Sequence, residues 1–330
     1  MRLICANHSA YPRVGETPES QRLRRAYARR ETGDVSTEGY VETARDYAAE
    51  VIAEQAEAGC DLVTDGQVHW YDLISHPASR LDGVGINGLL RFFDTNTYIR
   101  QPEILGPLSG RFDLTADYTW ATTVSSRPVK PVLTGPYTLA RYSIVRTDHY
   151  SDVAALTMAL AELVGDELHE LGRAGATLAQ IDEPELLRHP EDAALVNKAL
   201  QVATDRKGPL RVSLATYFGD ATDLYRTLLD MPVDMLALDL QYGPGLVAEI
   251  ERQGSDRPLA LGAVDGRNTA LDGTSVAGIV DRVAEALDSR GVEELHLQPS
   301  CSLEYLPRDR ARRKLVRMRE IAESVTKVGA

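Results

Sequence analysis

Short apolar runs alternate with long segments of helical periodicity along most of the chain. Eight runs are apolar at consecutive positions, as strands buried on both faces of a parallel sheet are. They occupy residues 3–7, 60–66, 130–136, 176–184, 210–216, 235–240, 259–265 and 294–300. The pattern therefore predicts eight strands, each separated from the next by a helical segment or a longer connection.

The segment after the first strand shows the helical pattern most clearly. Apolar or small residues recur from Val41 to Gln55 at helical spacing, with Ser36 or Thr37 as the expected cap and Gly59 as the stop. A second long helix is predicted over 152–175. Eight strand–helix units in one chain favour a closed α/β barrel over a doubly wound sheet. We therefore predict a single (β/α)8 (TIM) barrel domain over residues 1–330.

Residues 68–127 do not follow this rhythm. The stretch 83–102 is typical of a hairpin or an irregular excursion, and 115–126 is typical of a short helix. We predict that 68–127 is an insertion after the second strand that forms a lid over the barrel mouth. In that position it would bring His69 or Trp70 close to Asp182.

Composition limits the possible partners. The net charge is -13, which argues against a nucleic-acid surface, because phosphate contacts need clustered Lys and Arg. Three cysteines provide no disulfide framework, and no window has the apolar length of a signal peptide or a membrane span. The sequence therefore predicts a cytoplasmic protein whose partners include neither nucleic acid nor membrane.

Polar residues follow every predicted strand, where barrel enzymes carry their chemistry. Many strand-end Asp and Ser residues only cap the next helix. The adjacent carboxylates of Asp182 and Glu183 before Pro184 instead favour ligand binding, because such a pair is poorly suited to a buried strand end. Together these residues predict a site for a small polar molecule with an amine or hydroxyl group. The strand-end candidates are His8, Ser9, Asp65, Gln67, Thr134, Gly135, Asp182, Glu183, Ser213, Thr216, Asp239, Gln241, Asp265 and Cys301.

Four motifs, in this order, carry a resemblance to a known family: "TDGQVHWYDLI", "LTGPYTLARYSI", "QIDEPELL" and "QPSCSLEYLPRDRARRKLVRM". They resemble the catalytic barrel of the cobalamin-independent methionine synthases, above all the short single-barrel archaeal type, over essentially the whole chain. The resemblance implies an eight-stranded barrel that transfers a methyl group to the thiol of homocysteine. The implied methyl donor is a methylated folate or a methylcorrinoid protein.

The family's zinc site is carried over only in part. Its His-x-Cys pair falls on Ser213 and Ala215, its Glu falls on Asp239, and its last Cys falls on Cys301. Only Asp239 and Cys301 retain good zinc donors, so we expect that zinc is not bound in the family manner, and the cofactor is left open. His8 and His69 are the candidate replacement ligands, since imidazole binds zinc well.

The family's amino-acid pocket is better retained. The resemblance places the substrate amine on Asp182, with Gln67 at a second amine-binding position and Ser9-Ala10 at the position that holds the carboxylate. His8, His69, Trp70 and Gln241 are further candidate contacts, and Asp182, Asp239 and Cys301 are the candidate catalytic residues.

The leading hypothesis is a methionine-synthase-like transferase of methyl or a related alkyl group, acting on a small amino-acid-like or thiol substrate. A metal-independent or differently metallated transferase or lyase on the same barrel is one alternative. A non-catalytic binding relative is the other.

Overall fold

A computed structural model describes residues 1–243 and 245–326, so the last four residues of the predicted domain lie outside the described residues. Its centre is a seven-stranded sheet with the order β1-β10-β9-β8-β7-β6-β4, in which every neighbouring pair is parallel. The strands are β1 (Arg2–Cys5), β4 (Val132–Thr134), β6 (Leu178–Asp182), β7 (Arg211–Thr216), β8 (Met235–Asp239), β9 (Leu259–Val264) and β10 (Glu294–Pro299).

The predicted second strand, 60–66, is reduced to isolated bridges that join the two edges of this sheet. Ala6 bridges to Leu62, and Val63 bridges to Val129, both in the parallel sense. Lys130 N donates to Val63 O at 2.8 Å, which continues the contact toward β4. The α/β class predicted from the sequence is confirmed, with strands in chain order around the centre.

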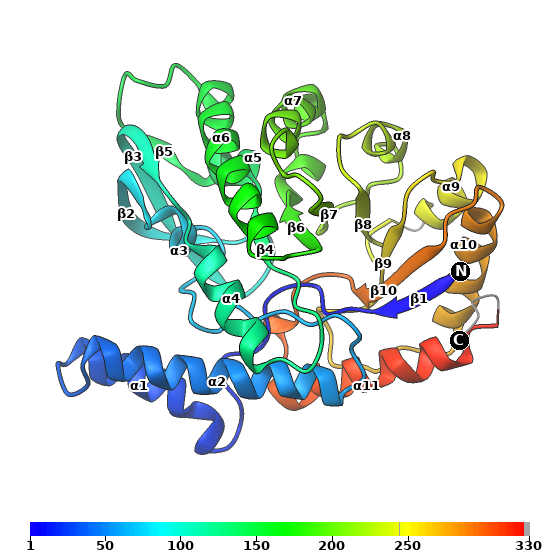
Figure 1. The fold of residues 1–330 in the computed structure, drawn as a ribbon, viewed down its shortest axis with the longest axis horizontal. Coiled ribbons are helices and arrows are strands. Elements are labelled where there is room, and N and C mark those ends of the chain that lie inside the picture. Colours follow the sequence, from blue (N-terminus) through cyan, green and yellow to red (C-terminus); the bar gives the residue numbers. More distant parts are fainter. Residues whose placement is uncertain (244, 327–330) are drawn as a thin grey trace.

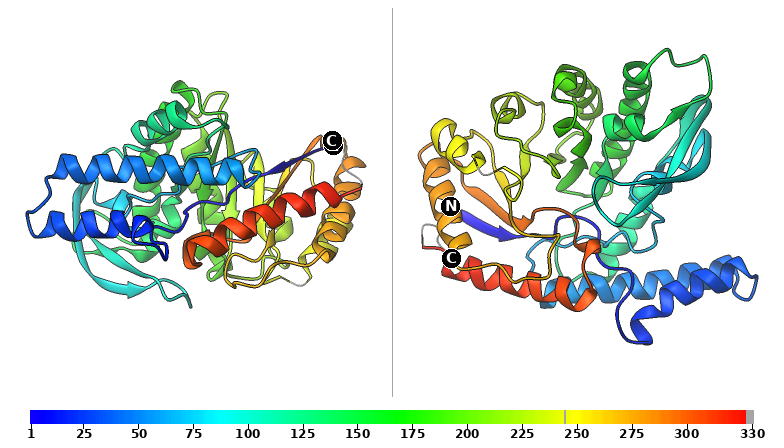
Figure 2. Two further views of the ribbon diagram at one scale, coloured as in Figure 1. Left: turned by 90° about the horizontal axis from the view of Figure 1, so that it is seen from below. Right: turned by 180° about the vertical axis from the view of Figure 1, so that it is seen from behind.

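Helices surround the strands, and α2 and α11 run side by side along one flank (Figures 1 and 2). No helix in the described ranges is long and apolar enough to cross a membrane. The helices outside the insertion are α1 (Arg22–Glu31), α2 (Thr37–Glu57), α5 (Pro136–Tyr142), α6 (Val153–Arg173), α7 (Ala193–Thr204), α8 (Tyr225–Leu229), α9 (Leu246–Gln253), α10 (Ser275–Asp288) and α11 (Arg308–Ser324).

Local signals set the ends of α2 as expected. The Ser36 hydroxyl accepts a hydrogen bond from Gly39 N at 3.1 Å, which satisfies one of the free N–H groups of the first turn. Gly59 has φ +99°, a left-handed conformation that glycine adopts without strain. The apolar face was predicted with one error: Val41 is 40% exposed, whereas Ala44, Ala48, Val51 and Ile52 are buried.

The insertion contains a long hairpin and a helix near 115–126, as the sequence indicated, and one further short helix that was not predicted. Strands β2 (Leu81–Arg91) and β3 (Tyr98–Gly110) pair antiparallel, flanked by α3 (Ser75–Ala78) and α4 (Leu114–Val124), and the short β5 (Ile144–Val145) pairs with β3. The hairpin turn contacts residues that follow β7 and β9. Phe93 packs on Phe218 with ring centroids 5.1 Å apart, and Asp94 pairs with Arg267 at 3.0 Å. The turn therefore lies at the carboxyl ends of the strands.

Small and aliphatic side chains from several strands form a buried cluster, and charged side chains meet at the amino end of β10. Leu178, Ala215, Met235, Ala237 and Ala260 form a buried cluster. At the amino end of β10, Glu294 accepts from Arg2 at 2.6 Å, and it lies 2.8 Å from His296 Nε2. His296 is therefore an interior histidine with its own partner.

Candidate functional site

Asp182, the last residue of β6, lies at the centre of a buried polar cluster at the carboxyl ends of the strands. Its side chain is 4% exposed. Gln180 Nε2 donates to Oδ1 at 2.7 Å, and the Tyr217 hydroxyl donates to Oδ2 at 3.2 Å. Burial raises the pKa of Asp182 to about 7, while these two donors oppose the rise because they stabilise the carboxylate.

Lys130 contacts the other side of the Gln180 amide. It is 2% exposed, and its Nζ donates to Gln180 Oε1 at 2.5 Å. An ammonium group has no acceptor, so the amide oxygen of Gln180 must face Lys130 and the amide NH2 must face Asp182. Burial lowers the pKa of Lys130 to about 8, and the charge of Asp182 opposes that change. Lys130 had no predicted role, although a lysine at the start of a predicted buried strand was a usable signal.

His8 and Ser9 reach the same cluster from the end of β1. His8 is 1% exposed, its Nδ1 lies 2.8 Å from the Ser9 hydroxyl, and its ring contacts the edge of Tyr217 at 5.1 Å. Burial lowers the pKa of His8 well below its usual value, so the imidazole is neutral at neutral pH. The structure thus links two predicted residues to Asp182 through Tyr217, which the sequence analysis did not identify.

Gln67 and Ala10 are each held by a hydrogen bond between a side chain and a backbone carbonyl oxygen. Gln67 has φ +50°, and its Nε2 donates to Val132 O at 3.2 Å, which anchors the side chain on β4. The carbonyl oxygen of Ala10 accepts from the Ser302 hydroxyl at 3.2 Å. This bond ties the Ser9-Ala10 segment to the loop that carries Cys301.

Glu183 points to α5, unlike its neighbour Asp182. Its carboxylate accepts from Tyr137 N at 2.9 Å, from Thr138 N at 2.8 Å and from the Thr138 hydroxyl at 2.6 Å. A Cβ atom at Gly135 would collide with this carboxyl group, so the turn before α5 requires glycine. Glu183 therefore anchors the start of α5, and the two carboxylates of the predicted pair have different structural surroundings.

Asp239 and Cys301 form the opposite side of the mouth. Asp239 accepts from Phe218 N at 3.2 Å and from Gln241 N at 2.8 Å, and burial raises its pKa to about 7. Cys301 is fully buried, and burial, followed by the charge of Asp239, raises the pKa of its thiol well above the usual value. Gln241 itself donates to Ala263 O at 2.9 Å, so its side chain is held against β9.

Arg267, which the sequence analysis also missed, supplies a positive charge to this side of the mouth. Its charge acts to lower the pKa values of both Asp239 and Cys301. The guanidinium lies over the rings of Phe218 at 5.1 Å and Tyr242 at 5.6 Å and pairs with Asp94 of the hairpin turn. In the sequence, Arg267 lies in the motif "AVDGRN", which marks it only as one of several polar residues after a predicted strand.

The positions that the resemblance assigns to zinc ligands carry side chains that differ from those of a zinc site. Ser213 and Ala215 lie on β7, and the buried hydroxyl of Ser213 has no hydrogen-bond partner among the described residues. Within residues 1–243 and 245–326, no three His, Cys, Asp or Glu side chains are grouped so that they could hold a metal ion. Of the two candidate replacement ligands, His8 is next to Ser9 and His69 bonds to Asp117, Nε2 to Oδ2, at 3.0 Å.

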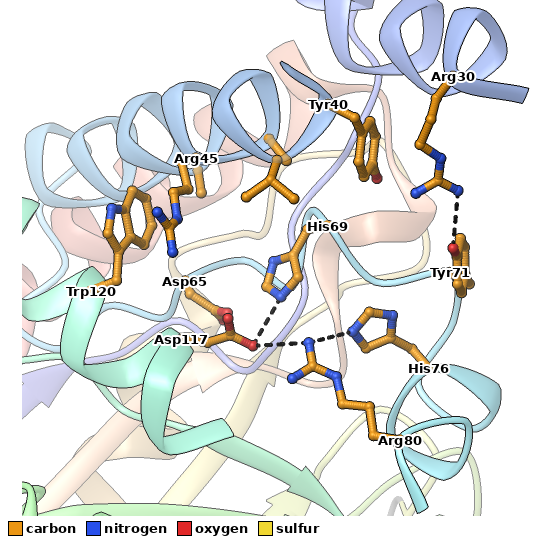
Figure 3. A pocket seen from close by; sticks show the side chains of 13 residues that line it. Arg30, Tyr40, Arg45, Asp65, His69, Tyr71, His76, Arg80, Asp117 and Trp120 are labelled. Atoms are coloured by element: carbon orange, nitrogen blue, oxygen red, sulfur yellow. Dashed lines mark hydrogen bonds and ion pairs between the residues drawn. The ribbon is translucent and has the colours of Figure 1, made fainter. Parts of the chain in front are cut away.

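His69 belongs to a cluster between α2, α3 and α4 (Figure 3), and Trp70 follows it in the chain. Trp70 stacks on His76 with ring centroids 5.2 Å apart and an interplanar angle of 15°. Among the described residues, neither side chain forms a hydrogen bond or ring contact with Asp182, so the expected proximity has no support in these contacts.

Comparison with known proteins agrees with the fold and the strand-end motifs. The family model described as "Cobalamin-independent synthase, Catalytic domain" matches residues 11–324. The chain belongs to this family. Its similarity to a methionine synthase of Pyrococcus abyssi is 29% identity over 317 residues, which covers 95% of this chain and 92% of the relative.

Longer members of the family match over part of their length. A 5-methyltetrahydropteroyltriglutamate–homocysteine methyltransferase of Streptomyces griseus is 28% identical over 303 residues, which covers 88% of this chain and 38% of that protein. Among solved structures, a B12-independent methionine synthase from Shewanella in complex with selenomethionine aligns with a TM-score of 0.79 at 20% identity. That alignment covers 98% of this chain and 97% of the other, and it supports the barrel fold of the cobalamin-independent synthase family.

Proposed function

We propose that the protein transfers a methyl or related alkyl group to the sulfur of a small amino acid of the homocysteine type. The names of the family relatives support this reaction class. The observation that carries the proposal is the geometry of Asp182. A buried carboxylate oriented by Gln180 and Tyr217 can bind the substrate ammonium, because the cation supplies the charge that burial leaves uncompensated.

The substrate sulfur is proposed to lie on the side of Asp239, Cys301 and Arg267. A free thiol has a pKa of about 8.5, so it needs a base or a nearby positive charge to react at neutral pH. Arg267 provides the charge, and Asp239, with a pKa raised to about 7, is suited to accept the thiol proton. The sulfur lone pair then forms the new C–S bond while the bond between the methyl group and its donor breaks and leaves its electron pair on the donor. A methylated folate or a methylcorrinoid protein is the proposed donor class.

We infer that zinc does not assist this step in the manner implied by the family. Ala215 has no donor atom, and serine is a poor zinc ligand compared with imidazole. Of the four positions that the resemblance assigns to zinc ligands, only Asp239 and Cys301 carry good zinc donors. This set of donors favours a second candidate, a metal-independent or differently metallated transferase or lyase acting on the same amino-acid substrate.

The decisive experiment measures methionine formation from L-homocysteine with methyltetrahydrofolate or methylcobalamin as donor, and calorimetric binding of L-homocysteine. Asp182→Asn should abolish binding and turnover. Asp288→Asn, which changes an exposed aspartate at the end of α10, should leave both unchanged. Binding of L-homocysteine without methionine formation would favour the second candidate, and absence of binding would refute the proposal.

A further inference from the structure

A cavity of about 240 Å³ lies between the helices α1, α2, α3 and α4, outside the cluster around Asp182 (Figure 3). Charged and aromatic side chains face it from all four helices, and the apolar surface of α2 forms one wall. Its lining includes Arg30, Tyr40, Ala44, Arg45, Asp65 and Trp120.

One group of charges in the cavity is neutralised within the protein. Asp117 lies 3.0 Å from His69 Nε2 and 3.6 Å from the Arg80 guanidinium, and both partners hold its pKa below the usual value although burial opposes this. Arg80 also donates to His76 Nε2 at 3.1 Å. Burial lowers the pKa of His76 to about 3, so that ring is neutral. These four side chains therefore pair with one another.

Three other charged groups form no ion pair among residues 1–243 and 245–326. Arg30 donates to the neutral Tyr71 hydroxyl at 3.1 Å and lies 4.6 Å over the Tyr40 ring, and Arg45 lies 6.0 Å from the Trp120 ring centre. Neither guanidinium forms an ion pair with a carboxylate among residues 1–243 and 245–326. Asp65 Oδ1 accepts from Gln67 N at 3.1 Å, and no other side chain in that part of the protein donates to its carboxylate.

The arrangement separates these charges in a way that suits a zwitterion. Figure 3 shows Arg45 and Asp65 on one side of the cavity, with Trp120 next to Arg45, and Arg30 with Tyr71 on the opposite side. A carboxylate and a guanidinium on the same side match the ammonium and carboxylate of an α-amino acid. Ala44 and the Tyr40 ring also line the cavity and offer an apolar surface for its side chain.

We propose that this cavity binds a free α-amino acid with an apolar or aromatic side chain, with its ammonium on Asp65 and its carboxylate on Arg45. Removal of water from around the Asp65 carboxyl raises its pKa, and a bound ammonium would reverse that effect. The pairing of a guanidinium with a carboxylate gives charge-assisted hydrogen bonds, which are shorter and stronger than bonds between neutral groups. This site does not depend on the proposed transferase reaction.

Both tryptophans of the chain report on the cavity, which makes the proposal directly measurable. Trp120 lines it, and Trp70 stacks on His76, which also lines it. L-Phenylalanine is the probe, because it carries an ammonium, a carboxylate and a flat apolar group. Titration should give a saturable change in tryptophan fluorescence. Phenethylamine, which lacks the carboxylate, and 3-phenylpropionate, which lacks the ammonium, should each bind at least about tenfold more weakly, as expected for loss of one charge-assisted hydrogen bond.

Two variants and a matched control test the assignment of the charges. Arg45→Gln should weaken L-phenylalanine binding by about tenfold but leave phenethylamine binding unaffected, because phenethylamine has no carboxylate. Asp65→Asn should weaken phenethylamine binding but leave 3-phenylpropionate binding unaffected, because 3-phenylpropionate has no ammonium. The amide oxygen introduced by Asp65→Asn can still accept the Gln67 N–H, and Arg45 is exposed, so neither change removes a buried contact. Arg24→Gln, at an exposed position of α1, should bind like the unmodified protein. A titration without saturation, or saturable binding that neither variant weakens, would overturn the proposal.

Discussion

Replacement of Lys130 by Met tests whether the buried polar chain below Asp182 sets the charge of that carboxylate. Lys130 fixes the orientation of the Gln180 amide, and its ammonium is the buried cation whose charge lowers the pKa of Asp182. Methionine has a similar length but no charge and no donor. In Lys130→Met, the Gln180 amide can turn its oxygen toward Asp182, which favours the protonated acid.

The size of the effect follows from the two hydrogen bonds. Bonds of 2.5 and 2.7 Å on either side of one amide place the ammonium roughly 7 Å from the carboxylate, which gives about 2 kcal/mol at an effective dielectric constant near 20. That energy corresponds to between about one and two pKa units. The pKa of Asp182, about 7 in the unmodified protein, should therefore rise further, and the carboxylate should be mostly protonated at neutral pH.

The assay is calorimetric binding of L-homocysteine as a function of pH. In the unmodified protein, affinity should increase as pH rises through about 7, because Asp182 must ionise to hold the ammonium. In Lys130→Met, the same increase should occur between about one and two pH units higher. Lys198→Met, at an exposed position of α7, serves as the control. An unshifted binding curve in a folded Lys130→Met protein would refute the electrostatic role of Lys130.

Three further predictions address the mouth of the barrel. Asp182→Asn should leave the melting temperature at pH 8, measured by calorimetry, nearly unchanged, because asparagine can still accept a hydrogen bond from Gln180 and carries no buried charge. A large drop in melting temperature with intact substrate binding would make Asp182 a structural residue. Protein purified without added metal should contain well under one zinc per chain by elemental analysis, and stoichiometric zinc that is lost in Cys301→Ser would contradict this. Asp94→Asn should weaken the ion pair with Arg267 and increase the rate of hydrogen exchange in the hairpin turn by a few-fold. The effect is small because a partly exposed ion pair contributes about 1 kcal/mol or less. An unchanged exchange rate would show that aromatic packing alone holds the turn.

The sequence alone determined the features that depend on local periodicity. Alternating apolar runs and helical segments predicted the parallel strands and the helices between them, because each element must bury a face set by its own repeat. Ser36 and Gly59 marked the ends of α2 through conformational preferences that act over a few residues. The hairpin within 68–127 was also visible, and so was the special position of Asp182 at the end of a buried strand.

Only the tertiary structure decided which side chains face one another across the barrel. Asp182 and Glu183 are adjacent in sequence, yet one meets Gln180 and Tyr217 while the other anchors α5. In a strand, successive side chains point to opposite faces, so two similar neighbours enter different environments.

Distant segments supplied the remaining site residues. Lys130, Tyr217 and Arg267 follow or begin different strands, and no short motif connects them to Asp182 or Cys301. Their roles arise from side-chain contacts between segments that are far apart in the chain and come together only when the strands pair. His69, in contrast, follows the strand-end motif directly, but its loop carries it to Asp117. The positions of catalytic candidates along the chain therefore came from local pattern, whereas their charge states and partners came from burial in the assembled fold.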